Sequence, residues 1–160
     1  MSFPNDRTYS FDVNLLLADN ASAYTGSGFS QVGGANAILD LGGNQGVTPL
    51  EQARVDAVAV IDVTGLDITS GNETYKMCVL VSNDPAFGPG NVVMAGEIEI
   101  GKGVSLDGFD MADSAVGRYE LMFTNQLAGT IYEYAALYLV IGGTTPSLNI
   151  SAFLAVLPEC

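Results

Sequence analysis

The sequence predicts an all-β protein, an antiparallel jelly-roll sandwich of about eight strands with an N-terminal glycine-rich arm or loop. Eight well-separated segments alternate apolar and polar residues, which is the pattern of strands buried on one side. Helical periodicity is nearly absent, with one candidate turn at residues 48–53. A chain of 160 residues has the length of one domain, and eight antiparallel strands in one domain most often form a jelly roll or a related sandwich.

The predicted strands are bounded by glycine- and proline-rich turns. In chain order they are residues 11–17, 37–41, 55–66, 73–83, 92–100, 118–124, 132–141 and 148–157. The clearest is 55–66, in which apolar residues at every second position from Ala57 to Val63 form one face. Strand 73–83 has apolar residues in both phases, so we expect it to be covered on both sides, with Cys78 buried.

Two long segments separate these strands. Residues 18–36 are rich in Gly, Ser, Ala and Asn, a composition typical of an arm or loop. We therefore divide the chain into an N-terminal strand and arm at 1–36 and a jelly-roll domain at 37–160. Residues 101–115 are polar and glycine-containing, which predicts a second loop.

The composition of the chain limits the classes of partner that it can bind. Charged residues make up 14% of the chain, well below the roughly 25% typical of soluble domains, which favours a surface partly covered by a partner. Five scattered basic residues against eighteen acidic ones give a formal net charge of −13, which argues against nucleic acid. Solubility is the simplest reason for the acidity, and a repulsive coat or docking on a basic surface are the alternatives. No apolar run is long enough to span a membrane and no secretory signal is visible, so we expect no membrane partner.

Catalytic equipment is sparse. The chain has no histidine, so a serine or cysteine triad of the usual type cannot be built. Glu97 and Glu99 could serve glycoside hydrolysis, but their spacing is that of a half-exposed strand. The glycines of residues 26–34 lack the lysine and helix of a phosphate loop. We expect no enzyme activity, no catalytic residues and no cofactor.

A calcium site is a weaker alternative. Asp107, Asp110 and Asp113 place three carboxylates in one loop, and calcium prefers oxygen ligands. Their spacing does not match an EF-hand, and loop acids are common. We therefore expect no metal, with these three residues as the candidates if one binds.

The interface candidates come from an aromatic strand and from the two long loops. Tyr132, Tyr134 and Tyr138 alternate along one strand, which favours a place in the core, with an interface as the alternative. Function in sandwiches commonly lies in end loops, so we look first in 18–36 and 101–115. The candidate interface residues there are Tyr24, Phe29, Gln31, Phe109 and Met111.

Several of these segments resemble the jelly-roll cement (decoration) proteins of tailed-bacteriophage capsids. The motif Ala-Ile-Leu-Asp-Leu-Gly at 37–42 is followed by the long strand 55–63 and by Cys-Val-Leu-Val-Ser-Asn-Asp-Pro-Ala-Phe at 78–87. Two late apolar strands, 134–139 and 151–157, complete the likeness. It covers roughly residues 35 to 157, while the arm at 18–36 and the loop at 101–116 lie outside the pattern.

The resemblance implies a structural virion protein. Such a protein would be made in the host cytoplasm and bind the outer capsid surface as a homodimer or homotrimer, bridging neighbouring major capsid subunits and stabilising the shell. Its partners would be the major capsid protein and other copies of itself. Two alternatives of other classes remain: a carbohydrate- or receptor-binding jelly-roll module, and a hydrolase that uses Glu97 or Glu99.

Overall fold

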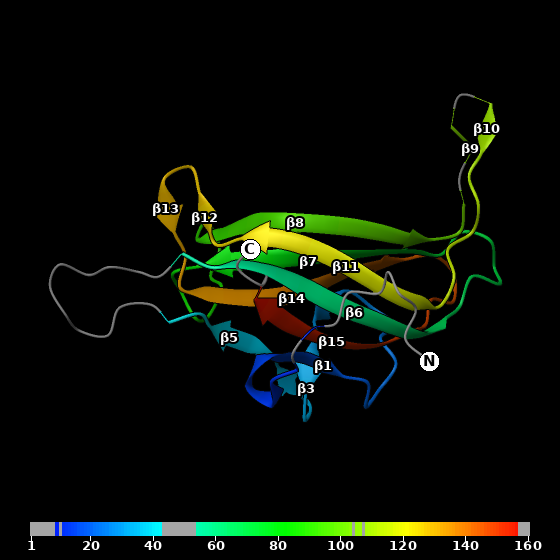
Figure 1. Ribbon diagram of the computed structural model, residues 1–160. Coiled ribbons are helices and arrows are strands. Elements are labelled where there is room, and N and C mark those ends of the chain that lie inside the picture. Colours follow the sequence, from blue (N-terminus) through cyan, green and yellow to red (C-terminus); the bar gives the residue numbers. More distant parts are fainter. Residues whose placement is uncertain (1–8, 10, 43–53, 104, 107, 157–160) are drawn as a thin grey trace, which may run out of the picture.

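The computed structural model describes residues 9, 11–42, 54–103, 105–106 and 108–156 of the chain. These residues form an all-β structure of antiparallel sheets, which confirms the all-β, antiparallel part of the predicted fold (Figure 1). Their one helical element is the 3₁₀ turn η1 (Val13–Leu15), capped by the Asp12 side chain, which accepts from the Asn14 N–H. The candidate turn at 48–53 lies outside the described residues.

Two sheets face each other. The first sheet has the order β1-β15-β6-β11, and in the second β2 and β5 both pair with β14, which is followed by β7 and β8. The first sheet consists of β1 (Leu16–Asp19), β15 (Leu148–Val156), β6 (Asp56–Leu66) and β11 (Gly117–Thr124). The second consists of β2 (Gly28–Phe29), β5 (Ile38–Asp40), β14 (Tyr134–Gly142), β7 (Thr74–Ser82) and β8 (Val92–Gly101).

Three short hairpins add to these sheets. They are β3 (Gln31–Val32) with β4 (Ala35–Asn36), β9 (Ser105–Leu106) with β10 (Phe109–Asp110), and β12 (Gln126–Leu127) with β13 (Thr130–Ile131). Gly33 and Gly34 turn the first hairpin with φ of +60° and +80°, a conformation that glycine adopts without strain.

The strand count differs from the predicted number. Each of the eight predicted segments contains a strand, but the described residues hold fifteen. The first strand begins at Leu16 and not at Phe11, because η1 takes up the residues before it. Residues 18–36, predicted as an arm or loop, contain β2, β3 and β4, and Phe29 of β2 pairs directly with Tyr138 of β14. These pairings span only two residues each, too short to leave an alternating pattern.

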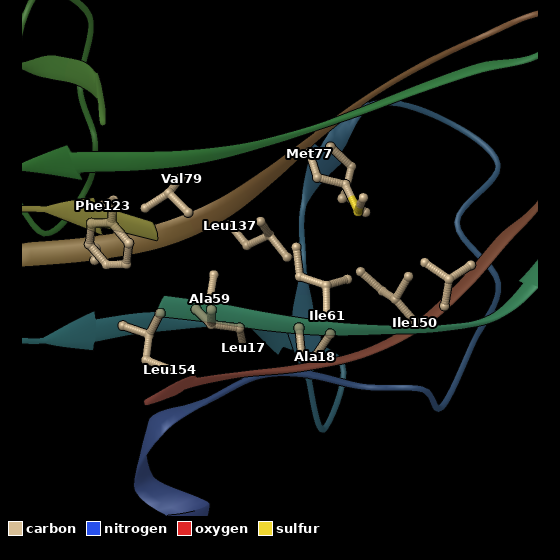
Figure 2. Packing of buried hydrophobic residues seen from close by; sticks show 14 of the residues in the cluster. Leu17, Ala18, Ala59, Ile61, Met77, Val79, Phe123, Leu137, Ile150 and Leu154 are labelled. Atoms are coloured by element: carbon tan, nitrogen blue, oxygen red, sulfur yellow. The ribbon is translucent and has the colours of Figure 1, made fainter. Parts of the chain in front are cut away.

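The core lies between the two sheets. Every second residue of β6, from Ala57 to Val63, faces inward and is buried, as predicted. Figure 2 shows Ile61 and Ala59 of the first sheet directed toward Met77, Val79 and Leu137 of the second. The one tyrosine buried in this core, Tyr75, donates its hydroxyl to the Asp67 carbonyl at 2.5 Å and accepts from the Ser147 N–H at 2.9 Å.

The core prediction for the tyrosine stripe is wrong for Tyr134 and Tyr138. The inward phase of β14 is Ala135, Leu137 and Leu139, all buried, so the tyrosines of the opposite phase face outward. Tyr132 precedes the strand and packs against the edge of the core. Both phases of this segment are apolar, and alternation alone could not decide which one faces inward.

The outer face of the first sheet is covered by the chain itself. Val58, Val60, Phe153 and Ala155 form a second buried cluster there, with Tyr9 and Leu16 packed against it. The Phe11 ring meets the Phe153 ring edge-on at 5.3 Å. The Tyr9 hydroxyl donates to Glu120 Oε2 at 2.8 Å, so the N-terminal segment lies across this face.

No helix long and apolar enough to cross a membrane is present among the described residues.

Candidate interaction surface

The outer face of the second sheet gathers apolar side chains from five strands. Residues directly opposite each other in an antiparallel pair point to the same side. Directly paired residues form rows across the strands, and three of these rows carry the outward-facing side chains considered next. The first row is Phe29, Tyr138, Cys78 and Glu97. The second is Ile38, Ala136, Leu80 and Met94, and the third is Val140, Lys76 and Glu99. We call the large apolar members of these rows, together with Phe87 from the loop after β7, the open face: Phe29, Ile38, Leu80, Phe87, Met94, Tyr138 and Val140.

Three aromatic rings form the centre of the open face. Phe29 packs edge-on against Tyr138, with ring centroids 5.0 Å apart, and against Phe87 at 5.6 Å. Edge-to-face contact is a favourable arrangement of aromatic rings. The cluster therefore holds Phe29, one of the predicted interface residues, in a fixed orientation.

A tight loop holds Phe87 in this cluster. Phe87 has φ of +51°, a left-handed conformation that costs a non-glycine residue about 1 kcal/mol or more. The Asp84 carboxylate stabilises the loop by accepting from the N–H groups of Ala86 at 2.9 Å and Gly88 at 3.0 Å. Those two hydrogen bonds hold the pKa of Asp84 below its ordinary value. The Asp84 hydrogen bonds thus hold Phe87 in a strained backbone conformation that places its phenyl ring on the open face.

The open face is partly exposed. Cys78 and Ala136 are buried beneath it and Phe87 is buried at its centre, whereas Met94 is 50% exposed and Val140 45% exposed. No buried cluster comparable to that on the first sheet forms on this side among the residues that the structure describes. Burial in this apolar setting, followed by the nearby charge of Glu97, raises the pKa of the Cys78 thiol, which disfavours the reactive thiolate form.

Carboxylates border the open face. On the β8 side, Lys76 Nζ lies 3.4 Å from Glu97 and 3.9 Å from Glu99. At the other end, Asp40 pairs across the sheet with Tyr134, and Glu133 precedes that tyrosine. Burial, then the neighbouring Glu133 carboxylate and the charge of Asp40, raise the pKa of Tyr134. The border therefore has four carboxylates and a single ammonium group.

The other basic side chains of the described part of the chain are neutralised as well. Arg54 pairs with Asp56 at 3.3 Å, Lys102 with Asp113 at 2.7 Å and Arg118 with Asp62 at 2.7 Å. Since the formal net charge of the whole chain is −13, the charge that these pairs leave over is negative. The molecule consequently offers a partner apolar atoms and carboxylates.

A second exposed apolar site is the β9–β10 hairpin, which extends away from the sandwich (Figure 1). Phe109 and Met111, two predicted interface residues, are 74% and 55% exposed. The base of the hairpin is clamped by Asp113, whose two oxygens accept from Lys102 Nζ at 2.7 Å and from the Gly103 N–H at 2.9 Å. A side chain at Gly103 would lie 2.0 Å from the Met111 carbonyl, so only glycine fits where the two arms meet.

The remaining predicted interface residues, Tyr24 and Gln31, lie elsewhere and have structural roles. Tyr24 exchanges backbone hydrogen bonds with Leu148, and its hydroxyl accepts from the Gln31 N–H at 2.9 Å. Burial raises the pKa of the Tyr24 hydroxyl. The predicted residues are therefore divided between three places, and the sequence prediction missed Ile38, Leu80, Phe87, Met94 and Val140. Their grouping depends on strand register, which no local pattern reveals.

The structure describes two of the three candidate calcium ligands. Asp107 lies outside the described residues, Asp110 is exposed on β10, and both oxygens of Asp113 are engaged in the clamp. The Lys102 ammonium and the Gly103 amide hold the pKa of Asp113 below its ordinary value. No group of three His, Cys, Asp or Glu side chains in the described ranges could hold a metal ion.

Among the described residues, one carboxylate is fully buried, that of Glu73. Its Oε2 accepts from the Gly71 N–H at 3.0 Å, and its Oε1 has no hydrogen-bond partner among the described residues. Burial by itself would raise the pKa of Glu73, but hydrogen bonds from the Ser70 hydroxyl and the backbone N–H groups of residues 71–73 outweigh it and lower the pKa. The side chain thus fixes the turn that precedes β7 through its hydrogen bond from Gly71.

The hollows of the described surface offer few side chains that are available for chemistry. One hollow, of about 450 Å³, is lined by Asn83, Asp84, Gly90, Asn91, Val93 and Tyr132. Its carboxylate, Asp84, is already used by the loop that carries Phe87. Comparison with known proteins adds no assignment, because this chain matches no family model and no curated protein.

Proposed function

We propose that this protein is a capsid cement (decoration) protein, which binds the outer surface of a tailed-phage shell as a homo-oligomer and bridges neighbouring major capsid subunits. The observation that carries the proposal is the exposure of apolar side chains at two separate places on one rigid scaffold. A bridging protein needs at least two adhesive surfaces, and the open face and the hairpin supply them. Several such contacts in each oligomer would bind by avidity without one strong site.

The strand order supports the jelly-roll topology that this family resemblance implies. Taking the eight longer elements β1, β5, β6, β7, β8, β11, β14 and β15 in sequence, the first pairs with the eighth and the second with the seventh. The third pairs with the sixth and the fourth with the fifth. This nested pairing is what a long hairpin rolled into two sheets would give.

A mixing experiment tests the function. Purified protein would be incubated with expanded and with unexpanded empty shells of the same virus and then sedimented. We expect it to pellet with at least one of the two shell forms in a saturable manner. Protein that stays in the supernatant with both forms would remove the proposal.

The second candidate is a carbohydrate- or receptor-binding module, which the partly exposed rings of Phe29 and Tyr138 on the open face favour. Sugar recognition of this kind needs a ring face open to the ligand, and Phe29 and Tyr138 are instead packed edge to face. Binding on a glycan array that disappears in Tyr138→Ala would favour this candidate over the cement protein.

A further inference from the structure

We infer that the open face is the surface that docks onto the shell, and that its partner is a protein surface with an apolar centre bordered by lysine or arginine side chains. The inference rests on the proposed function for the identity of the partner as a capsid shell. It adds the surface used by this chain and the chemistry of the surface that it meets.

The apolar centre comes from the aromatic cluster and its neighbours. Phe29, Phe87 and Tyr138 are held by mutual ring contacts, so little side-chain entropy remains to be lost on binding. Met94 and Val140 extend this centre and are about half exposed. Rigid aromatic residues with adjacent aliphatic ones are typical of the centre of a binding interface.

The border specifies the charge of the partner. Asp40, Glu133, Glu97 and Glu99 surround the apolar centre, and Lys76 lies between two of these carboxylates. Complementary charges at the edge of an interface guide association and exclude wrong partners. A surface bordered by basic side chains therefore fits, whereas nucleic acid and acidic surfaces are repelled.

The same charges argue against a second copy of this chain as the occupant. Two open faces brought together would oppose carboxylates of the same sign, and every basic side chain in the described part of the chain already has an acidic neighbour. Like charges opposed at an interface cost several kcal/mol by order of magnitude. The oligomer contact of the proposed cement protein must then use another surface.

Shell sedimentation with surface variants tests the inference. The double variant Met94→Asn, Val140→Asn changes two exposed side chains, and we expect its affinity for the shell to fall about tenfold or more. Met122→Asn is the matched control, since Met122 is a methionine of similar exposure on β11 of the first sheet, and it should bind like the wild type. A second double variant, Phe109→Asn, Met111→Asn, tests the hairpin as the competing surface.

Charge is tested separately. The variant Asp40→Asn, Glu133→Gln should bind more weakly at low salt, and its affinity should change less with added salt than that of the wild type. Thermal unfolding of each variant, compared with the wild type, shows whether the fold is retained.

The possible outcomes are distinct. Loss of binding in the open-face variant, with the Met122 control unchanged, supports the inference. Wild-type binding in the open-face variant with loss in the hairpin variant overturns the inference and leaves the cement function standing. If the wild type pellets with neither shell form, the proposed function fails and the inference falls with it. An oligomer of the free protein that dissociates in the open-face variant would show a second copy to be the occupant and would also overturn the inference.

Discussion

The outer faces of the two sheets differ in what lies over them. On the first sheet, Val58 and Val60 are fully buried because the N-terminal segment crosses them, with Phe11 on Phe153 and Tyr9 bonded to Glu120. On the second sheet, the Phe87 loop is the one segment of the described residues that packs over the outer face, and Met94 and Val140 remain half exposed. The outward-facing strand residues of both sheets are apolar in sequence. The comparison therefore shows that such residues are buried on one side of this sandwich and accessible on the other.

The largest expected difference comes from placing a charge on each face. Val60→Asp would bury an unpaired carboxylate and should lower the free energy of unfolding by about 3 kcal/mol or more. Val140→Asp, on the exposed face, should cost about 1 kcal/mol or less. Urea denaturation of both variants measures the contrast, and equal losses would show that the two faces are covered alike.

Removing an aromatic ring should give a smaller contrast. Phe153→Ala should destabilise the fold by about 3 kcal/mol, since its ring is 8% exposed and packs against Phe11. Phe29→Ala should cost about half as much, since its ring is only partly buried. The midpoints of urea denaturation report both values. A larger loss for Phe29 than for Phe153 would mean that the open face contributes more to stability than the covered one.

The loop that carries Phe87 should make stability depend on pH. The pKa of Asp84 is lowered in the folded state, so its stabilising effect is fully present above the ordinary aspartate pKa and is lost as the pH falls through the lowered value. Asp84→Asn should therefore lower the melting temperature at neutral pH, and the gap from the wild type should narrow in acid. Asp110→Asn is the control, because the Asp110 carboxylate makes no hydrogen bond to a described residue. A gap that stays constant with pH would contradict the role of the Asp84 carboxylate.

The smallest expected effect concerns two tyrosine hydroxyls. Tyr9→Phe removes the hydrogen bond to Glu120 that ties the N-terminal segment to the first sheet, and should cost about 0.5 kcal/mol. Tyr138→Phe on the open face should change stability less, since its hydroxyl has no hydrogen bond among the described residues. Denaturation midpoints measured side by side would settle the order, and a larger effect at Tyr138 would reverse it.

Much of the core could be predicted from the chain. Residues 57–63 alternate with one small or branched apolar phase, and that phase is the inward one. The alternation works here because the opposite phase contains Asp56 and Asp62, which must face water or a basic partner. The same method failed at Tyr138, because neighbouring positions in β14 are apolar in both phases.

The candidate surface could be predicted only in part. Phe29, Phe109 and Met111 could be named as candidates because they lie in the two long segments, 18–36 and 101–115, in which function was expected. Leu80, Met94 and Val140 were not, because nothing local distinguishes them from strand residues that face the core. They become neighbours of Phe29 through the pairing of β2, β14, β7 and β8, which brings together residues up to 111 positions apart.

The sequence by itself determined the secondary structure class, the inward phase of the well-patterned strands and the excess of negative charge, because each depends on residue type and on a period of two. The tertiary structure decided which apolar face is covered and which is accessible. That choice depends on strand order, on the path of the N-terminal segment and on a loop that holds Phe87 against Phe29. These are contacts between residues distant in the chain, whose free energy appears only when both partners are in place.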